Sequence, residues 1–300
     1  MCEKPDTSKQ MNGDKIGEEE SAFGSHDARW GTTFPHLVRL FPDEWLPGVL
    51  LRCDAVNDWP SETTLRFVYQ LARKGAAFSQ LNFCAPTSFP YDELAAGLAM
   101  HVESIYNTTY IQEMQRLFFP AKPHPAQLGP FHRHHYRVCP LCIQQSKLCR
   151  FLALPGLTLC PQHHVVLHEQ CVCLTPIRYF TSQSLLFCCH HCSHPWAGLP
   201  TIRGHEEKIH WEQQIFFLYQ SLLNYGDTPL LERICVSVSQ WMSQRHLVQL
   251  PLYDGSFLGY DAAFHSNSFS LCRLILAIVS IRQADPDYDQ TFGLKDALSF

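Results

Sequence analysis

The sequence predicts a mainly α-helical protein in which a small cysteine- and histidine-rich module separates two helical segments. Three observations lead to this fold class. Apolar residues recur at helical spacing on both sides of the module. Nine of the 14 cysteines and nine of the 17 histidines fall within residues 132–194. The chain has 300 residues, 46% of them hydrophobic, which is enough to bury helical cores.

Charge and hydropathy exclude two classes of protein. The net charge of −5 excludes a uniformly basic nucleic-acid coat protein, although it permits a local basic face. Residues 1–29 hold four basic and seven acidic side chains, so we expect a flexible acidic tail without a signal-peptide pattern. The longest apolar run, Leu271–Ile281, is broken by Arg273 and is too short to span a bilayer. We therefore expect a cytoplasmic protein whose clustered thiols bind metal rather than form disulfides.

The first helical segment is predicted to be a helix-turn-helix-like domain at residues 30–120. The pattern Glu44-x-Leu46-x-x-x-Leu50-x-Arg52, just after Pro42, predicts the start of a helix. Ser61 is expected to cap a second helix, which ends at Gly75. Two later apolar stripes predict further helices: Leu94, Leu98, Val102 and Ile105, then Ile111, Met114, Leu117 and Phe118.

The rest of the chain divides into three predicted parts. We expect a proline-rich linker at residues 121–131, the cysteine-rich module at 132–204 and a C-terminal helical domain at 205–300. Three apolar stripes mark the helices of that last domain: Ile209, Phe216, Tyr219 and Leu223; Leu231, Ile234, Val238 and Trp241; Leu271, Leu274, Ile275, Ile278 and Val279. Residues 211–300 hold five basic and nine acidic side chains, which suits a basic protein partner better than duplex DNA.

The first half of the module contains two short motifs that predict a metal site. Cys139-Pro-Leu-Cys142 is a C-x-x-C knuckle, and Cys160-Pro-Gln-His163 is a C-x-x-H knuckle that follows after 17 intervening residues. A knuckle lets two ligands reach one ion from a tight turn, and two knuckles complete a tetrahedron. The spacing therefore predicts a site with three cysteines and one histidine.

The second half of the module predicts a site with four cysteines. Cys171-Val-Cys173 is followed, after 15 intervening residues, by Cys189-His-His-Cys192, and Cys188 is an adjacent competitor as a ligand. Because four protein ligands fill each site, both are expected to be structural rather than catalytic. We expect two structural Zn²⁺ ions, with redox chemistry or an iron–sulfur cluster as the alternatives.

The other cysteines and the charges of the module have simpler interpretations. Cys149 has no partner at ligand spacing, and packed thiols are expected at Cys53, Cys84, Cys235 and Cys272. Residues 132–204 hold six basic side chains and one acidic one, a formal charge of +5 that two zinc sites with seven thiolates lower to about +2. The stretch His132–Arg137 is either a contact to phosphates and base edges or a solvated arm.

The sequence offers no constellation for catalysis. His101-Val-Glu103 with Cys139-Pro-Leu-Cys142 matches the zinc-deaminase signature only superficially, because Val138 stands where that signature has proline. A glycine-rich phosphate loop and an acidic trio for two-metal chemistry are not found in the sequence. The chain is therefore not expected to be an enzyme.

The ordered motifs resemble those of the TniQ/TnsD family of transposon target-selection proteins. The resemblance rests on the two knuckles, on Arg150 and the apolar stretch Phe151–Leu159 between them, on the second cysteine group, and on the Glu44–Arg52 pattern. It covers about residues 34–200. The sequence departs from the family in the second site, where C-x-x-C is usual and Cys171-x-Cys173 stands.

The resemblance implies an adaptor that neither cuts nor joins DNA. Such proteins mark an insertion site and pass it to an AAA+ TnsC-like ATPase regulator. Some bind target DNA directly, and others accompany a CRISPR effector complex with its guide RNA. The direct binders tend to be longer, so 300 residues and an acidic balance favour the effector-associated kind in a bacterial cytoplasm, acting at the nucleoid.

Two other functions remain open at this stage. One is a sequence-specific DNA-binding protein that recognises a fixed attachment site or regulates transcription, which predicts duplex binding with a steep salt dependence. The other is a zinc-stabilised structural subunit of an unrelated assembly.

Overall fold

The computed structural model describes residues 33–72, 89–117, 136–180, 187–247, 249–252, 257–259 and 271–294. The described residues belong to one compact unit, and the predicted mainly helical fold is confirmed. The predicted domain boundaries stay a prediction. Several other predictions lie outside the described residues: the acidic tail, the linker at 121–131, Gly75, Cys84, Phe118 and the arm at 132–135.

The first helix, α1 (Leu46–Val56), begins where the sequence predicts it. Pro47 lies in its first turn, where a missing backbone N–H costs nothing. Glu44, just before the helix, is buried, and its carboxylate accepts hydrogen bonds from Arg52 Nε at 2.7 Å and Nη2 at 2.6 Å. The Glu44–Arg52 pattern is therefore an ion pair that ties the incoming chain to the second turn of its own helix.

The predicted cap of the second helix, α2 (Thr63–Leu71), is wrong. Glu62 occupies the cap position with a φ of 77°, and its side chain makes no capping bond. The buried carboxylate of Asp54, in α1, accepts from the backbone N–H groups of Glu62 at 3.0 Å and Thr64 at 2.7 Å. Burial raises the pKa of Asp54 to about 6. The cap of α2 thus comes from the neighbouring helix rather than from Ser61.

Three short helices follow: α3 (Tyr91–Gly97), α4 (Val102–Tyr106) and α5 (Ile111–Leu117). The stripe from Leu94 to Ile105 was predicted as one helix, but it is divided between α3 and α4. The division occurs because Ala99 adopts a φ of 52°, which a continuous right-handed helix does not permit. The two helices pack against each other, so the apolar residues still share one core.

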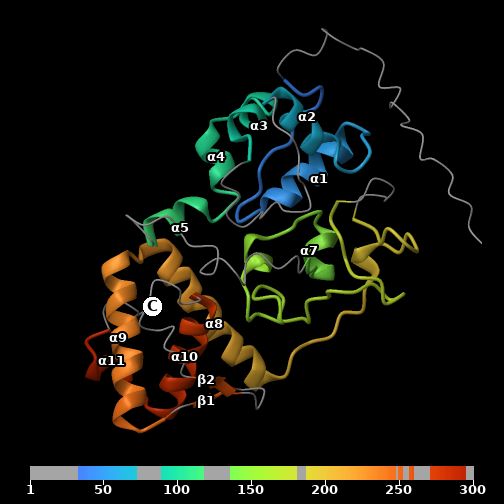
Figure 1. The fold of residues 1–300 in the computed structure, drawn as a ribbon. Helices are drawn as coiled ribbons and strands as arrows, with labels where there is room; N and C mark the ends of the chain where they lie inside the picture. Colours follow the sequence, from blue (N-terminus) through green and yellow to red (C-terminus); the bar gives the residue numbers. More distant parts are fainter. Residues whose placement is uncertain are drawn as a thin grey trace, which may run out of the picture. The chain divides into compact units, whose positions relative to one another are not determined.

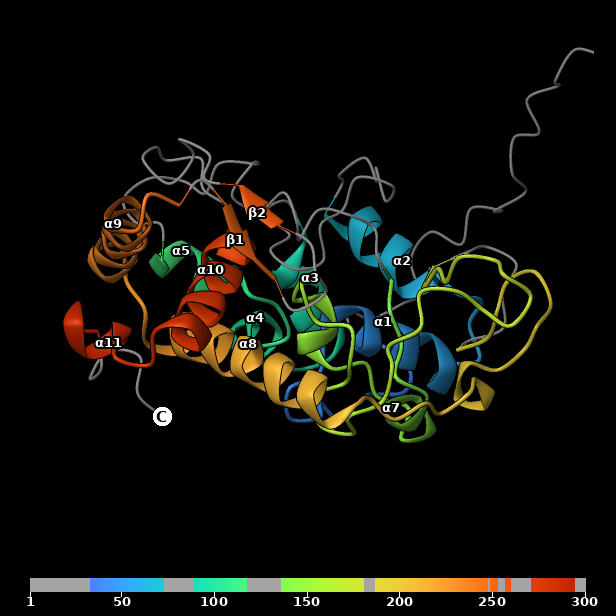
Figure 2. The ribbon, with the colours of Figure 1, turned by 90° about the horizontal axis from the view of Figure 1, so that it is seen from below.

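The C-terminal segment contains α8 (Glu206–Tyr225), α9 (Thr228–Gln244), α10 (Leu271–Ala284) and α11 (Tyr288–Thr291). The three predicted stripes lie in α8, α9 and α10 and are buried, except for half-buried Phe216. Figures 1 and 2 show α10 packed beside α8. No helix among the described residues is long and apolar enough to cross a membrane.

A small antiparallel hairpin lies between α9 and α10 and was not predicted. Its strands are β1 (Gln249–Pro251) and β2 (Phe257–Gly259), with Leu250 opposite Leu258. Strands of three residues are too short to show the alternation that marks a strand in a sequence.

The cysteine-rich module has little regular structure: α7 (Pro140–Gln144) and two 3₁₀ turns, η2 (Arg150–Ala153) and η3 (Trp196–Gly198). Its loops converge on the buried guanidinium of Arg137. This group donates to the backbone carbonyls of Leu152 and Leu154, both at 2.7 Å, and of Leu157. Burial lowers the pKa of Arg137. Arg137 therefore organises the interior of the module rather than belonging to a basic arm.

The N-terminal helices are joined to the module along one stretch of backbone. Trp45 N donates to Leu148 O at 2.7 Å, and Arg150 N donates to Asp43 O at 2.8 Å. The Arg150 side chain then reaches Glu113 Oε1 at 2.6 Å. Arg150, the arginine that follows the first knuckle in the sequence, therefore joins the module to α5.

The C-terminal helices are joined to the module through Glu212 in α8. Its carboxylate is buried and accepts from the backbone N–H groups of Thr158 and Leu159, both at 2.7 Å, and from Thr158 Oγ1 at 2.5 Å. Three donors on one carboxylate hold the loop that leads directly into Cys160.

We predict that Glu212→Ala lowers the free energy of unfolding by about 2–4 kcal/mol, because it leaves buried donors without an acceptor. Glu207→Ala, at an exposed position on the first turn of the same helix, serves as the control. Urea unfolding followed by circular dichroism measures both. Equal stability of the two variants would show that the carboxylate does not hold the loop.

Candidate metal centres

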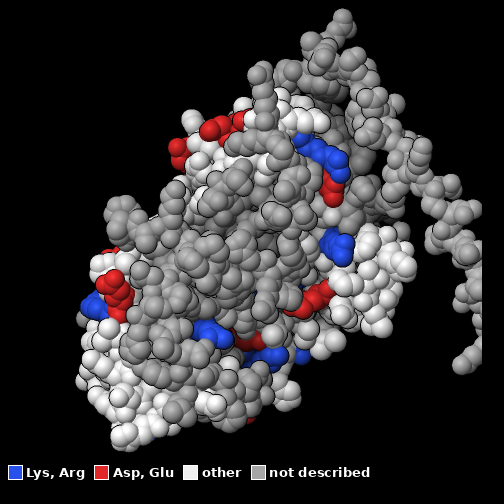
Figure 3. All heavy atoms as spheres, viewed as in Figure 1, with Lys and Arg blue, Asp and Glu red and all other residues white. Residues whose placement is uncertain are grey.

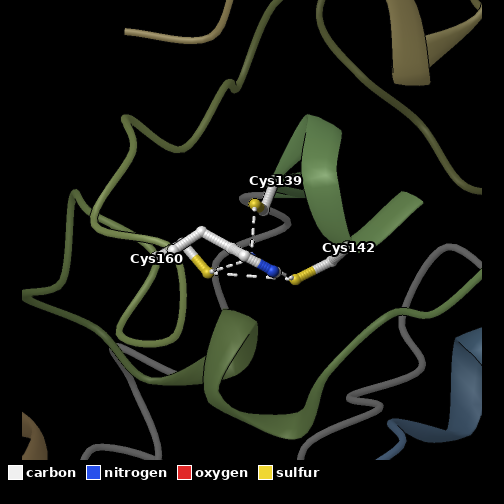
Figure 4. A group of neighbouring side chains, drawn as sticks. Cys139, Cys142 and Cys160 are labelled. Carbon is white, nitrogen blue, oxygen red and sulfur yellow. Dashed lines mark hydrogen bonds between the residues drawn. The ribbon is translucent and has the colours of Figure 1, made fainter. Parts of the chain in front are cut away.

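The first candidate centre is built from a short helix and a tight turn. Cys139 stands immediately before α7 and Cys142 lies within it, with Pro140 at the first helical position. Cys160 and His163 come from a turn that is closed by the His164 N–H donating to Cys160 O at 2.7 Å. Figure 4 shows the three sulfurs pointing toward one imidazole nitrogen.

The distances within this cluster fit a tetrahedral zinc ion. His163 Nδ1 lies 3.4 Å from the sulfur of each of Cys139, Cys142 and Cys160. The sulfurs of Cys142 and Cys160 are 3.8 Å apart. A tetrahedron with the usual zinc bond lengths needs edges of about 3.6 Å between sulfur and nitrogen and about 3.8 Å between sulfurs. The four predicted donors are therefore already close to ligand geometry.

The second candidate centre brings together the four predicted thiols. Cys171 and Cys192 have sulfurs 3.6 Å apart, as do Cys173 and Cys189. These separations are close to the zinc edge of about 3.8 Å, so the tight Cys171-x-Cys173 spacing is compatible with one ion. Cys188, the competing ligand, is not part of this group of four.

The two centres differ in exposure. In the first, all three cysteines are buried and His163 is half-buried. In the second, Cys171 and Cys189 are buried, Cys173 is half-buried and Cys192 is exposed. Each group has four donor atoms within 4.8 Å of one another and could hold a metal ion. Sulfur-rich donor sets with imidazole suit Zn²⁺ better than the hard cations Mg²⁺ and Ca²⁺.

Mutual hydrogen bonds set the protonation of the metal-free thiols. Hydrogen bonds from Cys142 and Cys160 lower the pKa of Cys139, and the same contacts with Cys139 raise the pKa of the other two. In the second centre, the hydrogen bond with Thr175 lowers the pKa of Cys173 to about 6. Without metal, the mutual hydrogen bonds thus favour ionisation of Cys139 over ionisation of Cys142 and Cys160.

Sequence spacing did not reveal the position of Cys149. Its buried sulfur lies 3.9 Å from that of Cys142 and 3.8 Å from Gln162 Oε1, so it does have a neighbour in the first centre. Cys53 and Cys235 are buried, as predicted for packed thiols, and Cys272 is half-buried. Burial raises the pKa of Cys235 to about 12. The contact of Cys149 with Cys142, seven residues earlier, depends on how the loop folds and does not follow a known ligand spacing in the sequence.

The described part of the module exposes fewer unpaired basic side chains than its formal charge indicates. Arg137 is internal, Arg150 pairs with Glu113 at 2.6 Å, and Arg203 pairs with Glu206 at 2.9 Å. On the face seen in Figure 3, the described Lys and Arg side chains are scattered and do not form a stripe. The described part of the module therefore offers few basic side chains for phosphate.

Comparison with known proteins identifies part of the chain. Residues 35–167 match the family model described as TniQ. The matched stretch spans α1 to α5 and the whole first candidate centre, and it ends before the second. No curated protein matches the chain.

We predict that Cys139→Ala or His163→Ala removes one of two bound zinc ions and lowers stability by at least about 3 kcal/mol, because metal binding is folding free energy. Metal analysis of the purified protein and thermal melting measure both effects. Cys188→Ser is the control and keeps two ions. A Cys139→Ala protein with two ions and unchanged melting would contradict the assignment.

Zinc affinity of the first centre should fall by about a hundredfold per pH unit as the pH drops from 8 to 7. The raised pKa values keep Cys142 and Cys160 protonated in the metal-free protein, so binding releases two protons and low pH favours the free form. Cys192→Ala removes a ligand of the second centre, so that competition with a chromophoric chelator in this variant measures the zinc affinity of the first centre alone. An affinity independent of pH would contradict the prediction.

Proposed function

Because residues 35–167 form a TniQ domain, the chain belongs to the TniQ family, and we propose that it selects target sites for transposition. It is a transposition-associated adaptor. In this proposal it links a target-bound CRISPR effector complex, or target DNA itself, to an AAA+ TnsC-like ATPase regulator. The protein then works in the bacterial cytoplasm, at the nucleoid. The observation that carries the proposal is the match itself, which covers helices α1 to α5 and the first candidate metal centre.

The proposed role of the metal is structural. Two Zn²⁺ ions stabilise the module, each with four protein ligands: Cys139, Cys142, Cys160 and His163 in the first centre, and Cys171, Cys173, Cys189 and Cys192 in the second. A site with four protein ligands has no open position for a water or a substrate. This agrees with the general character of TniQ proteins, which are non-enzymatic adaptors.

The charge distribution supports a protein partner over a direct electrostatic grip on DNA. Of the basic side chains in the described part of the module, only Lys147 and Arg178 are neither buried nor engaged in an ion pair with a carboxylate. Non-specific affinity for DNA grows with the number of phosphates that a protein neutralises. We therefore place the effector-associated adaptor first and direct recognition of an attachment site second.

Co-purification from the native cells tests the proposal. A tagged chain is recovered after nuclease treatment, and its partners are identified by mass spectrometry. We expect the AAA+ regulator together with CRISPR effector subunits and guide RNA. The Cys139→Ala variant, which disturbs the TniQ domain, should recover less of both partners.

Other outcomes separate the alternatives. Recovery of the regulator without an effector would favour direct recognition of a DNA site. Recovery of neither partner, with duplex binding by the purified chain that weakens steeply with salt, would support a DNA-binding regulator and contradict the adaptor.

A further inference from the structure

Each sulfur of the first centre lies beside a hydrogen-bond donor. The backbone N–H of Cys142 acts as a hydrogen-bond donor that lowers the pKa of Cys139, and the backbone N–H of His163 acts in the same direction on Cys160. Beside the sulfur of Cys142 lies the thiol of Cys149, 3.9 Å away, within the reach of a hydrogen bond between sulfurs. Two of the three donors are therefore backbone groups, and the third is a side chain.

The Cys149 thiol is held in place by the backbone on both sides of it. Leu148 O accepts from Trp45 N at 2.7 Å, and Arg150 N donates to Asp43 O at 2.8 Å. Cys149 itself is fully buried, and its backbone pairs with that of Glu44 in an antiparallel arrangement. Because these bonds fix the backbone, the Cys149 thiol is already positioned beside the sulfur of Cys142 before a metal binds.

Metal binding strengthens this contact. Three thiolates on a divalent ion leave a net charge of −1 in a buried site, and donors around such a site stabilise the charge. A thiolate accepts a hydrogen bond more strongly than a neutral thiol does. Without metal, the Cys149 thiol has Gln162 Oε1 as an acceptor at 3.8 Å. An interaction that is stronger in the metal-bound form raises the affinity for the metal.

We infer that Cys149 is a positioning residue for the first metal centre, donating its S–H to the metal-bound Cys142 thiolate without binding the metal itself. The inference rests on a metal occupying that centre, which belongs to the proposed function. It does not depend on the role in transposition.

Zinc competition with a chromophoric chelator, on the full chain, tests this role. Wild type should bind two ions. Cys149→Ala should also bind two, with the affinity for one of them lowered about tenfold, as for other groups that support a ligand. Cys149→Ser keeps a donor and should stay within about threefold of wild type. Cys53→Ala, the same change at a buried thiol outside both centres, should leave both affinities unchanged.

Two results of the competition experiment would overturn the inference. Unchanged affinity in Cys149→Ala would show that the thiol gives no support, and equal losses in the alanine and serine variants would show a packing effect. A Cys139→Ala variant with the same metal count as wild type would instead refute the metal centre itself. Should the alanine variant not fold, the charge-transfer band of Co²⁺-loaded Cys149→Ser must still differ from that of wild type, because the donor to the thiolate has changed. An identical band would also overturn the inference.

Discussion

The convergence of Cys139, Cys142, Cys160 and His163 is the constraint on which the rest of the structure depends. The chain after the first knuckle carries Leu148 to Arg150, which bond to the backbone before α1 and to α5. The chain before the second knuckle carries Thr158 and Leu159, which bond to Glu212 in α8. One group of four donors therefore fixes both of the segments onto which the helices dock. A metal ion bound at this point would stabilise the docking of helices that it does not touch.

Buried charge reinforces the same arrangement and has a consequence for function. The Nη1 and Nη2 atoms of Arg137 donate to backbone carbonyls, while Arg52 and Arg150 face the carboxylates of Glu44 and Glu113. These guanidinium groups hold loops together, and their hydrogen bonds are directed at the protein itself. A chain that uses its arginines in this way has fewer of them for phosphate contacts. This supports the proposed adaptor, in which protein partners rather than arginine contacts to phosphate carry most of the target recognition.

The sequence predicted the features that follow from regular spacing and missed those that depend on how the chain folds back on itself or on an unexpected backbone conformation. The knuckles, the start of α1 and the apolar stripes of α8 to α10 follow from short patterns, because ligands and helix faces repeat at fixed intervals. The cap of α2 was missed because Asp54 reaches it from another helix. The break at Ala99 was missed because alanine is a good helix former and gives no signal for a positive φ. The internal role of Arg137 and the contact of Cys149 with Cys142 exist only after the loops have folded.

Hydrogen exchange of the zinc-loaded wild type and of Cys139→Ala, followed by mass spectrometry of peptides, tests the central claim most directly. If the first centre fixes both docking segments, protection falls in the module, at the chain before α1 and in the first half of α8. Protection that falls only around residues 139–163, with the other two regions unchanged, would contradict the account. The helices would then dock on the module without the help of the metal.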